Sequence, residues 1–123
     1  MRTAKGTYHA ARLVVTAGAW ATTLLADLGV PLAVLRQVPL WLRPREPALF
    51  RRDRFPAWIA DVPAGVFYGF PMIDPRGAKL ARHYGAAERP TPDGVDWDAH
   101  DADEEPVRAF AATHLPTLDG PRT

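Results

Sequence analysis

The stretch Val66-Phe67-Tyr68-Gly69-Phe70-Pro71, followed by Lys79 and His83, decides the fold that the sequence predicts. The run is apolar and aromatic, which is typical of a β-strand. Asp74-Pro75-Arg76-Gly77 has the chemistry of a turn, because proline presets φ and glycine accepts a positive φ. Residues 78–84 then read as a second strand. The stretch therefore predicts a β-hairpin.

The predicted hairpin gathers reactive side chains on one face. A four-residue loop of Asp74 to Gly77 would pair Met72 with Lys79, Phe70 with Ala81, and Tyr68 with His83. Strand side chains alternate, so all six would lie on one face. A face that carries a phenol, an ammonium and an imidazole is typical of a pocket wall. A loop of odd length would instead separate Tyr68 from Lys79.

Length and composition limit the function classes. At 123 residues the chain is one domain by length, and a net charge of +1 argues against nucleic acid as the main partner. The chain contains no cysteine, which excludes disulfides, thiol nucleophiles and cysteine-ligated metal. It also contains no serine, which excludes serine hydrolase chemistry. The apolar stretches are too short to span a bilayer, so we expect no membrane partner. The absence of cysteine fits a reducing cytoplasm, so we expect a cytoplasmic protein.

The first 29 residues predict a strand, a turn and a helix. Arg12 to Thr16 is a short β-branched run, typical of a buried strand. Ala17-Gly18-Ala19 follows as a turn, and Trp20 to Leu28 has the apolar stripe of a helix that stops at Gly29. Such a unit places a ligand against a helix N-terminus.

Residues 30–123 predict an antiparallel sheet, because strands follow one another with few helices between them. Trp58 to Asp61 reads as a further strand, and Glu88 to Asp101 as a polar loop. The fold class is thus α+β, an antiparallel sheet platform with flanking helices.

A helix is predicted from Asp103 to His114. Asp103 would be its N-cap, with acidic residues on the positive end of the dipole and Pro106 in the first turn. Val107, Phe110 and Ala111 would form its buried stripe.

The ordered motifs resemble a known family, the FAD-dependent amine oxidases of the monomeric sarcosine oxidase and N-methyltryptophan oxidase group, within the D-amino acid oxidase superfamily. The resemblance runs over nearly the whole chain and is carried by Ala17-Gly18-Ala19-Trp20, Leu28-Gly29, Pro31-Leu32, Arg36-Gln37-Val38, Trp41, Phe55-Pro56, Tyr68-Gly69-Phe70-Pro71, Gly77-Ala78-Lys79, His83 and Leu115-Pro116.

The resemblance implies that residues 30–123 are a substrate domain whose sheet covers the flavin, and that residues 1–29 are a piece of the FAD domain. It implies a lysine for oxygen activation at Lys79, and substrate-site residues at Tyr68 and His83. The turn that includes Ala17, Gly18 and Trp20 would lie near the cofactor. The implied partners are a small N-methyl or secondary amino acid and O2.

The chain also departs from the family pattern. It has no G-x-G-x-x-G motif and no cysteine for a covalent flavin link. The resemblance therefore implies a middle fragment of a longer enzyme whose FAD domain is missing. FAD is expected in the complete protein but is not expected to be retained by this chain.

Plainer interpretations remain open beside these. Lys79 could be a solvated edge charge, His83 a surface or core histidine, and Tyr68 a packing residue. Trp20 suits a helix core better than a flavin stacker. The chain could also be a non-catalytic sheet module that forms a homo-oligomer through its exposed platform.

Overall fold

The computed structural model describes residues 1–84 and 90–123 and divides the chain into two compact units, Met1–Val34 and Leu35–Thr123. Glu88 and Arg89, the first residues of the predicted polar loop, lie outside the described residues. The structure contains antiparallel sheets and a few helices, which is compatible with the predicted α+β class. None of the described helices is long and apolar enough to cross a membrane.

Unit 1 consists of short elements. They are β1 (Arg2–Thr3), β2 (Gly6–Thr7), the 3-10 turn η1 (Gly18–Trp20), α1 (Ala21–Leu24) and the 3-10 turn η2 (Ala26–Leu28). The predicted helix is therefore present as three consecutive short turns. Gly29 ends them with φ of 65°, the left-handed conformation that glycine adopts without a Cβ clash, which confirms the predicted stop.

The predicted strand from Arg12 to Thr16 is wrong. No regular element includes these residues, and Leu13 and Val14 are 64% and 82% exposed. A strand exists only when its backbone N–H and C=O groups pair with a neighbour, and none of the described strands pairs with this run. A β-branched composition favours a strand, but it does not provide the neighbouring strand with which the run would have to pair.

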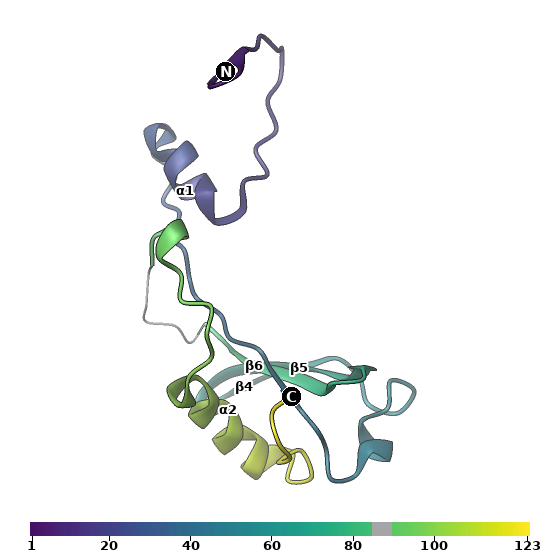
Figure 1. Ribbon diagram of the computed structural model, residues 1–123. Helices are drawn as coiled ribbons and strands as arrows, with labels where there is room; N and C mark the ends of the chain where they lie inside the picture. Colours follow the sequence, from purple (N-terminus) through teal and green to yellow (C-terminus); the bar gives the residue numbers. More distant parts are fainter. Residues whose placement is uncertain (85–89) are drawn as a thin grey trace. The chain divides into compact units, whose positions relative to one another are not determined.

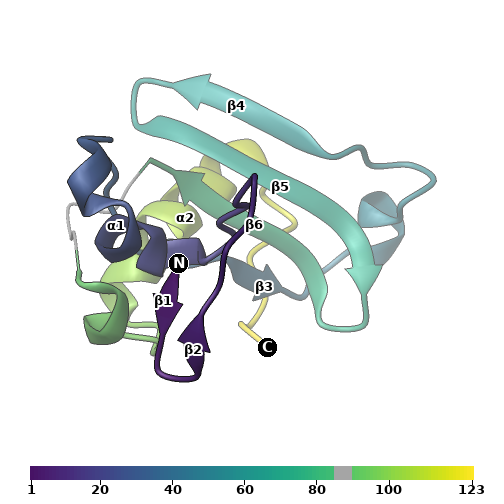
Figure 2. The same cartoon turned by 90° about the horizontal axis from the view of Figure 1, so that it is seen from above.

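Unit 2 is built on a four-stranded antiparallel sheet in the order β3-β6-β5-β4 (Figure 2). Its strands are β3 (Leu40–Leu42), β4 (Trp58–Val62), β5 (Gly65–Asp74) and β6 (Gly77–His83). The predicted hairpin is β5 and β6. Its turn contains only two residues between paired ends, because Asp74 pairs with Gly77. The Asp74 carboxylate accepts the Arg76 backbone N–H at 2.9 Å and so fastens this turn.

The predicted register of the hairpin is wrong by two residues beyond its turn. Lys79 pairs with Phe70 rather than Met72, and the register shifts between Phe70 and Asp74. Pro71 lies in this irregular stretch and has no N–H to donate to the ladder, while Met72 bridges to Arg51 instead. An even shift preserves the alternation of faces, so the reactive side chains still share one face.

Helix α2 (Asp101–His114) covers one face of the sheet (Figure 1). Its N-cap is His100 rather than Asp103, and Asp103 is the third helical residue, where its carboxylate accepts the His100 backbone N–H at 2.9 Å. Pro106 accordingly lies inside the helix and not in the first turn. The short 3-10 turns η3 (Pro47–Phe50) and η4 (Pro92–Gly94) complete the unit.

The core lies between α2 and the sheet. Val107, Phe110 and Ala111 are buried, which confirms the predicted stripe. The Phe110 ring stacks on Phe67 and Trp58, with ring centroids 4.3 Å and 5.4 Å apart. Such aromatic pairs stabilise a fold by roughly 0.5–1.5 kcal/mol beyond their buried area. The core therefore packs α2 against one face of the sheet.

Candidate functional site

The face of the sheet opposite α2, here called the outer face, carries the candidate site. Its side chains come from all four strands and are Trp41, Ile59, Tyr68, Phe70, Lys79 and His83. The register places them together, because Trp41 pairs with Lys79, Phe70 with Lys79, and Ile59 with Tyr68. Apart from Ile59, these side chains are half-buried.

Tyr68 and His83 are in direct contact. Their rings meet edge to face with centroids 5.6 Å apart, and Tyr68 makes a similar contact with Phe70 at 6.1 Å. Edge-to-face rings are the favoured geometry of aromatic pairs. The phenol and the imidazole therefore form one polar corner of the outer face.

Lys79 lies at the other end of this row. Its Nζ atom is 5.9 Å from the centre of the Phe70 ring and 5.6 Å from the centre of the Trp41 ring. Lys79 and His83 are four residues apart on β6, about 13 Å at the rise of a strand, so they do not touch. The outer face thus has a Tyr68–His83 end and a Lys79 end, with aromatic rings between them.

Ala17, Gly18 and Trp20 lie in unit 1, whereas Tyr68, Lys79 and His83 lie in unit 2. The Trp20 backbone N–H donates to the Ala17 carbonyl at 3.1 Å, and Gly18 has φ of 54°. The Trp20 side chain is 49% exposed, so the interpretation of Trp20 as a helix core residue is wrong for this chain. A four-residue α1 offers too little surface to bury an indole.

Sequence reasoning missed Trp41 as a neighbour of Lys79. The signal was present, since Trp41 follows the Arg36-Gln37-Val38 motif on an extended segment. Its pairing with Lys79 depends on the order of strands in the sheet, because β3 joins β6 and not its neighbour in sequence, β4.

Comparison with known proteins shows what the chain is similar to. No family model matches the chain. Its sequence is 39% identical over 124 residues to monomeric sarcosine oxidase of Streptomyces avermitilis and 34% identical over 123 residues to that of Bacillus sp. (strain NS-129). It is 31% identical over 94 residues to N-methyl-L-tryptophan oxidase of Salmonella typhi. The chain is a homologue of these oxidases.

The homology confirms the resemblance that the motifs indicated. The aligned regions cover 98% of this chain for the two sarcosine oxidases and 76% for the N-methyl-L-tryptophan oxidase. They cover 32%, 32% and 24% of the relatives. The chain thus spans about a third of the length of the sarcosine oxidases that it matches.

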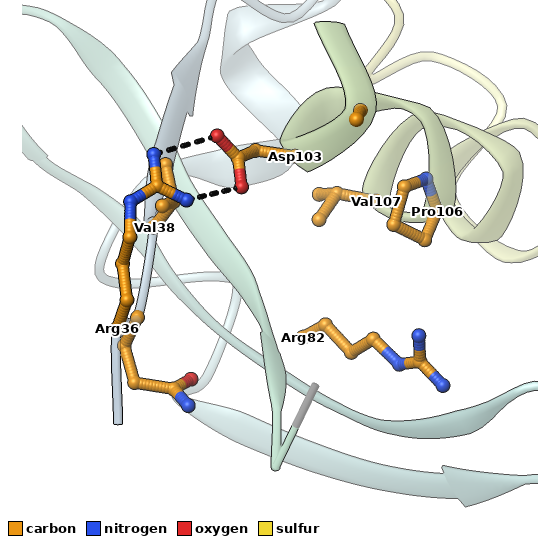
Figure 3. Close-up of a pocket in the computed structure, with 8 residues that line it drawn as sticks. Arg36, Val38, Arg82, Asp103, Pro106 and Val107 are labelled. Atoms are coloured by element: carbon orange, nitrogen blue, oxygen red, sulfur yellow. Dashed lines mark hydrogen bonds and ion pairs between the residues drawn. The ribbon is translucent and has the colours of Figure 1, made fainter. Parts of the chain in front are cut away.

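A cavity of about 120 Å³ lies on the α2 side of the sheet (Figure 3). Arg36 and Asp103 form a two-bond ion pair at its edge, with N–O distances of 2.6 Å and 2.8 Å. Arg82 borders the same cavity, and its buried Nε atom has no hydrogen-bond partner among the residues that the structure describes. Because Arg82 alternates with His83 on β6, this cavity lies behind the outer face and is not the candidate site.

The Arg36–Asp103 pair makes stability depend on pH. The hydrogen bonds from Arg36 lower the pKa of Asp103 from 3.8 to about 2. A carboxyl group with a lowered folded-state pKa stabilises the fold above its ordinary pKa, and that contribution is lost as pH falls toward 2. We expect Asp103→Asn to lower the free energy of unfolding at pH 7 by about 1–2 kcal/mol, a figure reduced for solvent screening. The variant should also show a smaller change of that free energy between pH 4 and pH 2 than the parent chain.

Urea unfolding at a series of pH values measures both effects. Asp101→Asn is the matched control, because Asp101 is the first residue of α2, whereas the hydrogen bonds between described residues join Arg36 to Asp96, Asp98 and Asp103. An Asp103→Asn profile that runs parallel to the parent profile below pH 4 would show that the ion pair contributes nothing.

Proposed function

We propose that this chain forms the substrate-facing wall of an FAD-dependent oxidase that acts on small N-methyl or secondary amino acids. The observation that carries the proposal is the outer face, where a phenol, an imidazole and an ammonium lie along one row of aromatic rings. The oxidase names of the homologues support the same reaction class.

The residues of the outer face fit a flavin. Aromatic rings line this face, and the described residues include no carboxylate paired with Lys79. An aromatic, cationic surface suits a planar group that carries electrons and negative charge. FAD, when bound, would supply the two-electron oxidation of the amine to an imine and the reduction of O2 to hydrogen peroxide.

The side chains of the chain take separate roles in this proposal. The Lys79 ammonium stabilises the negative charge that develops on O2, as preorganised electrostatic catalysis does. Tyr68 and His83 line the other end of the row and position the amino acid. By the resemblance, Ala17, Gly18 and Trp20 would belong to the part of the enzyme that binds FAD.

Flavin retention tests the proposal. We expect this chain, incubated with excess FAD and passed through gel filtration, to show no flavin absorbance, because it supplies a wall and not the dinucleotide site. A longer protein that includes the chain and a complete FAD domain should keep the yellow flavin spectrum. A longer protein that elutes free of flavin contradicts the proposal.

A second candidate function is a non-catalytic module that self-associates through the outer face. Ile59 favours it, because this residue is 67% exposed on β4, one of the two edge strands of the four-stranded sheet. Sedimentation equilibrium of the chain decides this point: a dimer that Ile59→Lys converts to monomer supports the module, and a monomer at high concentration excludes it.

A further inference from the structure

The Lys79 ammonium is held by aromatic rings. Its Nζ atom lies within 6 Å of the ring centres of both Trp41 and Phe70, the range in which a ring face attracts a cation. Among the described residues no aspartate or glutamate forms an ion pair with Lys79. The contacts with the Trp41 and Phe70 rings therefore orient this side chain without a neutralising carboxylate among the described residues.

Other neighbouring residues hold Trp41 in place. The guanidinium carbon of Arg76 lies 4.0 Å from the centre of the indole ring. Arg76 is held in turn by Asp74, with two bonds of 2.8 Å to its carboxylate. The backbone carbonyl of Trp41 accepts the Thr123 N–H at 3.1 Å, which holds β3 on its outer edge. The β5–β6 turn and the residues beside β3 thus set the place of the indole.

A ring contact and a carboxylate contact have different consequences for an ammonium. A carboxylate would orient Lys79 but would also cancel its charge toward any third group. A ring attracts the cation through its quadrupole and carries no net charge, so the full positive charge stays available. A lysine side chain has four rotatable bonds, and a contact that orients it without neutralising it is what electrostatic stabilisation of a developing anion needs.

We infer that Trp41 is a positioning residue, which holds the Lys79 ammonium along the outer face with its charge uncompensated. Trp41 acts through Lys79 and does not touch the reacting atoms. The further step, in which the oriented Lys79 ammonium stabilises negative charge on O2, rests on the proposed function. The contact itself is a property of the chain alone and can be tested without a flavin.

The chain contains only two lysines, Lys5 and Lys79, which makes the test direct. Reductive methylation with a 13C label gives one dimethyl-lysine NMR signal for each lysine. The signal that disappears in Lys79→Arg is that of Lys79. We expect the Lys79 signal to lie upfield of the exposed Lys5 signal because of ring currents. Trp41→Leu should move it toward Lys5, and Trp41→Phe should restore part of the shift. Trp97→Leu is the control, because Trp97 is 86% exposed.

Coincident Lys5 and Lys79 signals in the parent chain, or a Lys79 signal unchanged in Trp41→Leu, would overturn the inference. Trp41→Phe keeps the test valid if Trp41→Leu fails to fold, because its smaller ring should still reduce the shift.

The reaction with O2 separates this inference from the proposed function. In the flavin-loaded protein that contains the chain, Trp41→Leu should slow flavin reoxidation by about 2- to 30-fold, the range that a cation–π contact spans, and leave flavin reduction unchanged. If the NMR shift is lost in Trp41→Leu but reoxidation keeps its rate, the orienting contact stands and the role of Lys79 toward O2 is overturned.

Discussion

The Lys79→Met variant of the flavin-loaded protein that contains this chain should react with O2 about 100- to 1,000-fold more slowly than the parent protein. Methionine keeps the length and apolar stem of lysine but removes the charge that we assign to stabilising negative charge on O2. Reduction of the flavin by the amine does not build charge at this place, so its rate should change by less than about tenfold. Rapid mixing of each half-reaction measures the two rates.

Two variants control this experiment. Lys5→Met removes the only other lysine of the chain, which lies in unit 1, and should leave both rates unchanged. Lys79→Arg keeps a cation and should recover part of the lost rate. An equal loss in both half-reactions for Lys79→Met would show that Lys79 supports the structure of the site and has no specific role in oxygen reduction.

Gly77→Ala should destabilise the fold of unit 2 by about 2–5 kcal/mol. Gly77 has φ of 126°, which residues with a Cβ rarely adopt. A Cβ here would also lie 2.2 Å from the carbonyl oxygen of Leu42, a backbone atom of the buried strand β3. The clash would push β3 away from β6, and with it Trp41 away from Lys79. Urea unfolding measures the loss of stability.

Gly65→Ala is a matched control for Gly77→Ala. Gly65 has φ of 125°, so the backbone strain is the same, but its Cβ would meet the Arg82 side chain at 3.0 Å. A flexible side chain can move aside, whereas the backbone of β3 cannot. We expect Gly65→Ala to cost about 1–3 kcal/mol. If the two variants lose equal stability, the contact between Gly77 and β3 does not limit the fold.

The β5–β6 hairpin shows how far sequence reasoning reaches. Aromatic composition and turn residues predict both strands, and an even register shift keeps Tyr68, Lys79 and His83 on one face. The predicted register is wrong, because Pro71 interrupts the hydrogen-bond ladder and Met72 pairs with Arg51, which lies 21 residues earlier in the chain. Pairing between distant segments leaves no local pattern in the sequence.

The same limit explains the other misses. Alternation predicted the outer face, but the contact of Trp41 with Lys79 depends on strand order. Asp103 reads as an N-cap by residue type, yet helix α2 begins two residues earlier because His100 and the Asp103 carboxylate cap it together. Residue type predicts that a helix begins nearby, and only the hydrogen bonds fix where.

Anaerobic mixing of the flavin-loaded protein that contains this chain with sarcosine, and separately with N-methyl-L-tryptophan, tests the central claim most directly. We predict that at least one of these amines bleaches the oxidised flavin absorbance, and that admission of air restores it with one hydrogen peroxide formed per amine oxidised. A flavin that stays oxidised with both, and with other small secondary amino acids, would contradict the assignment of the outer face to an amine oxidase site.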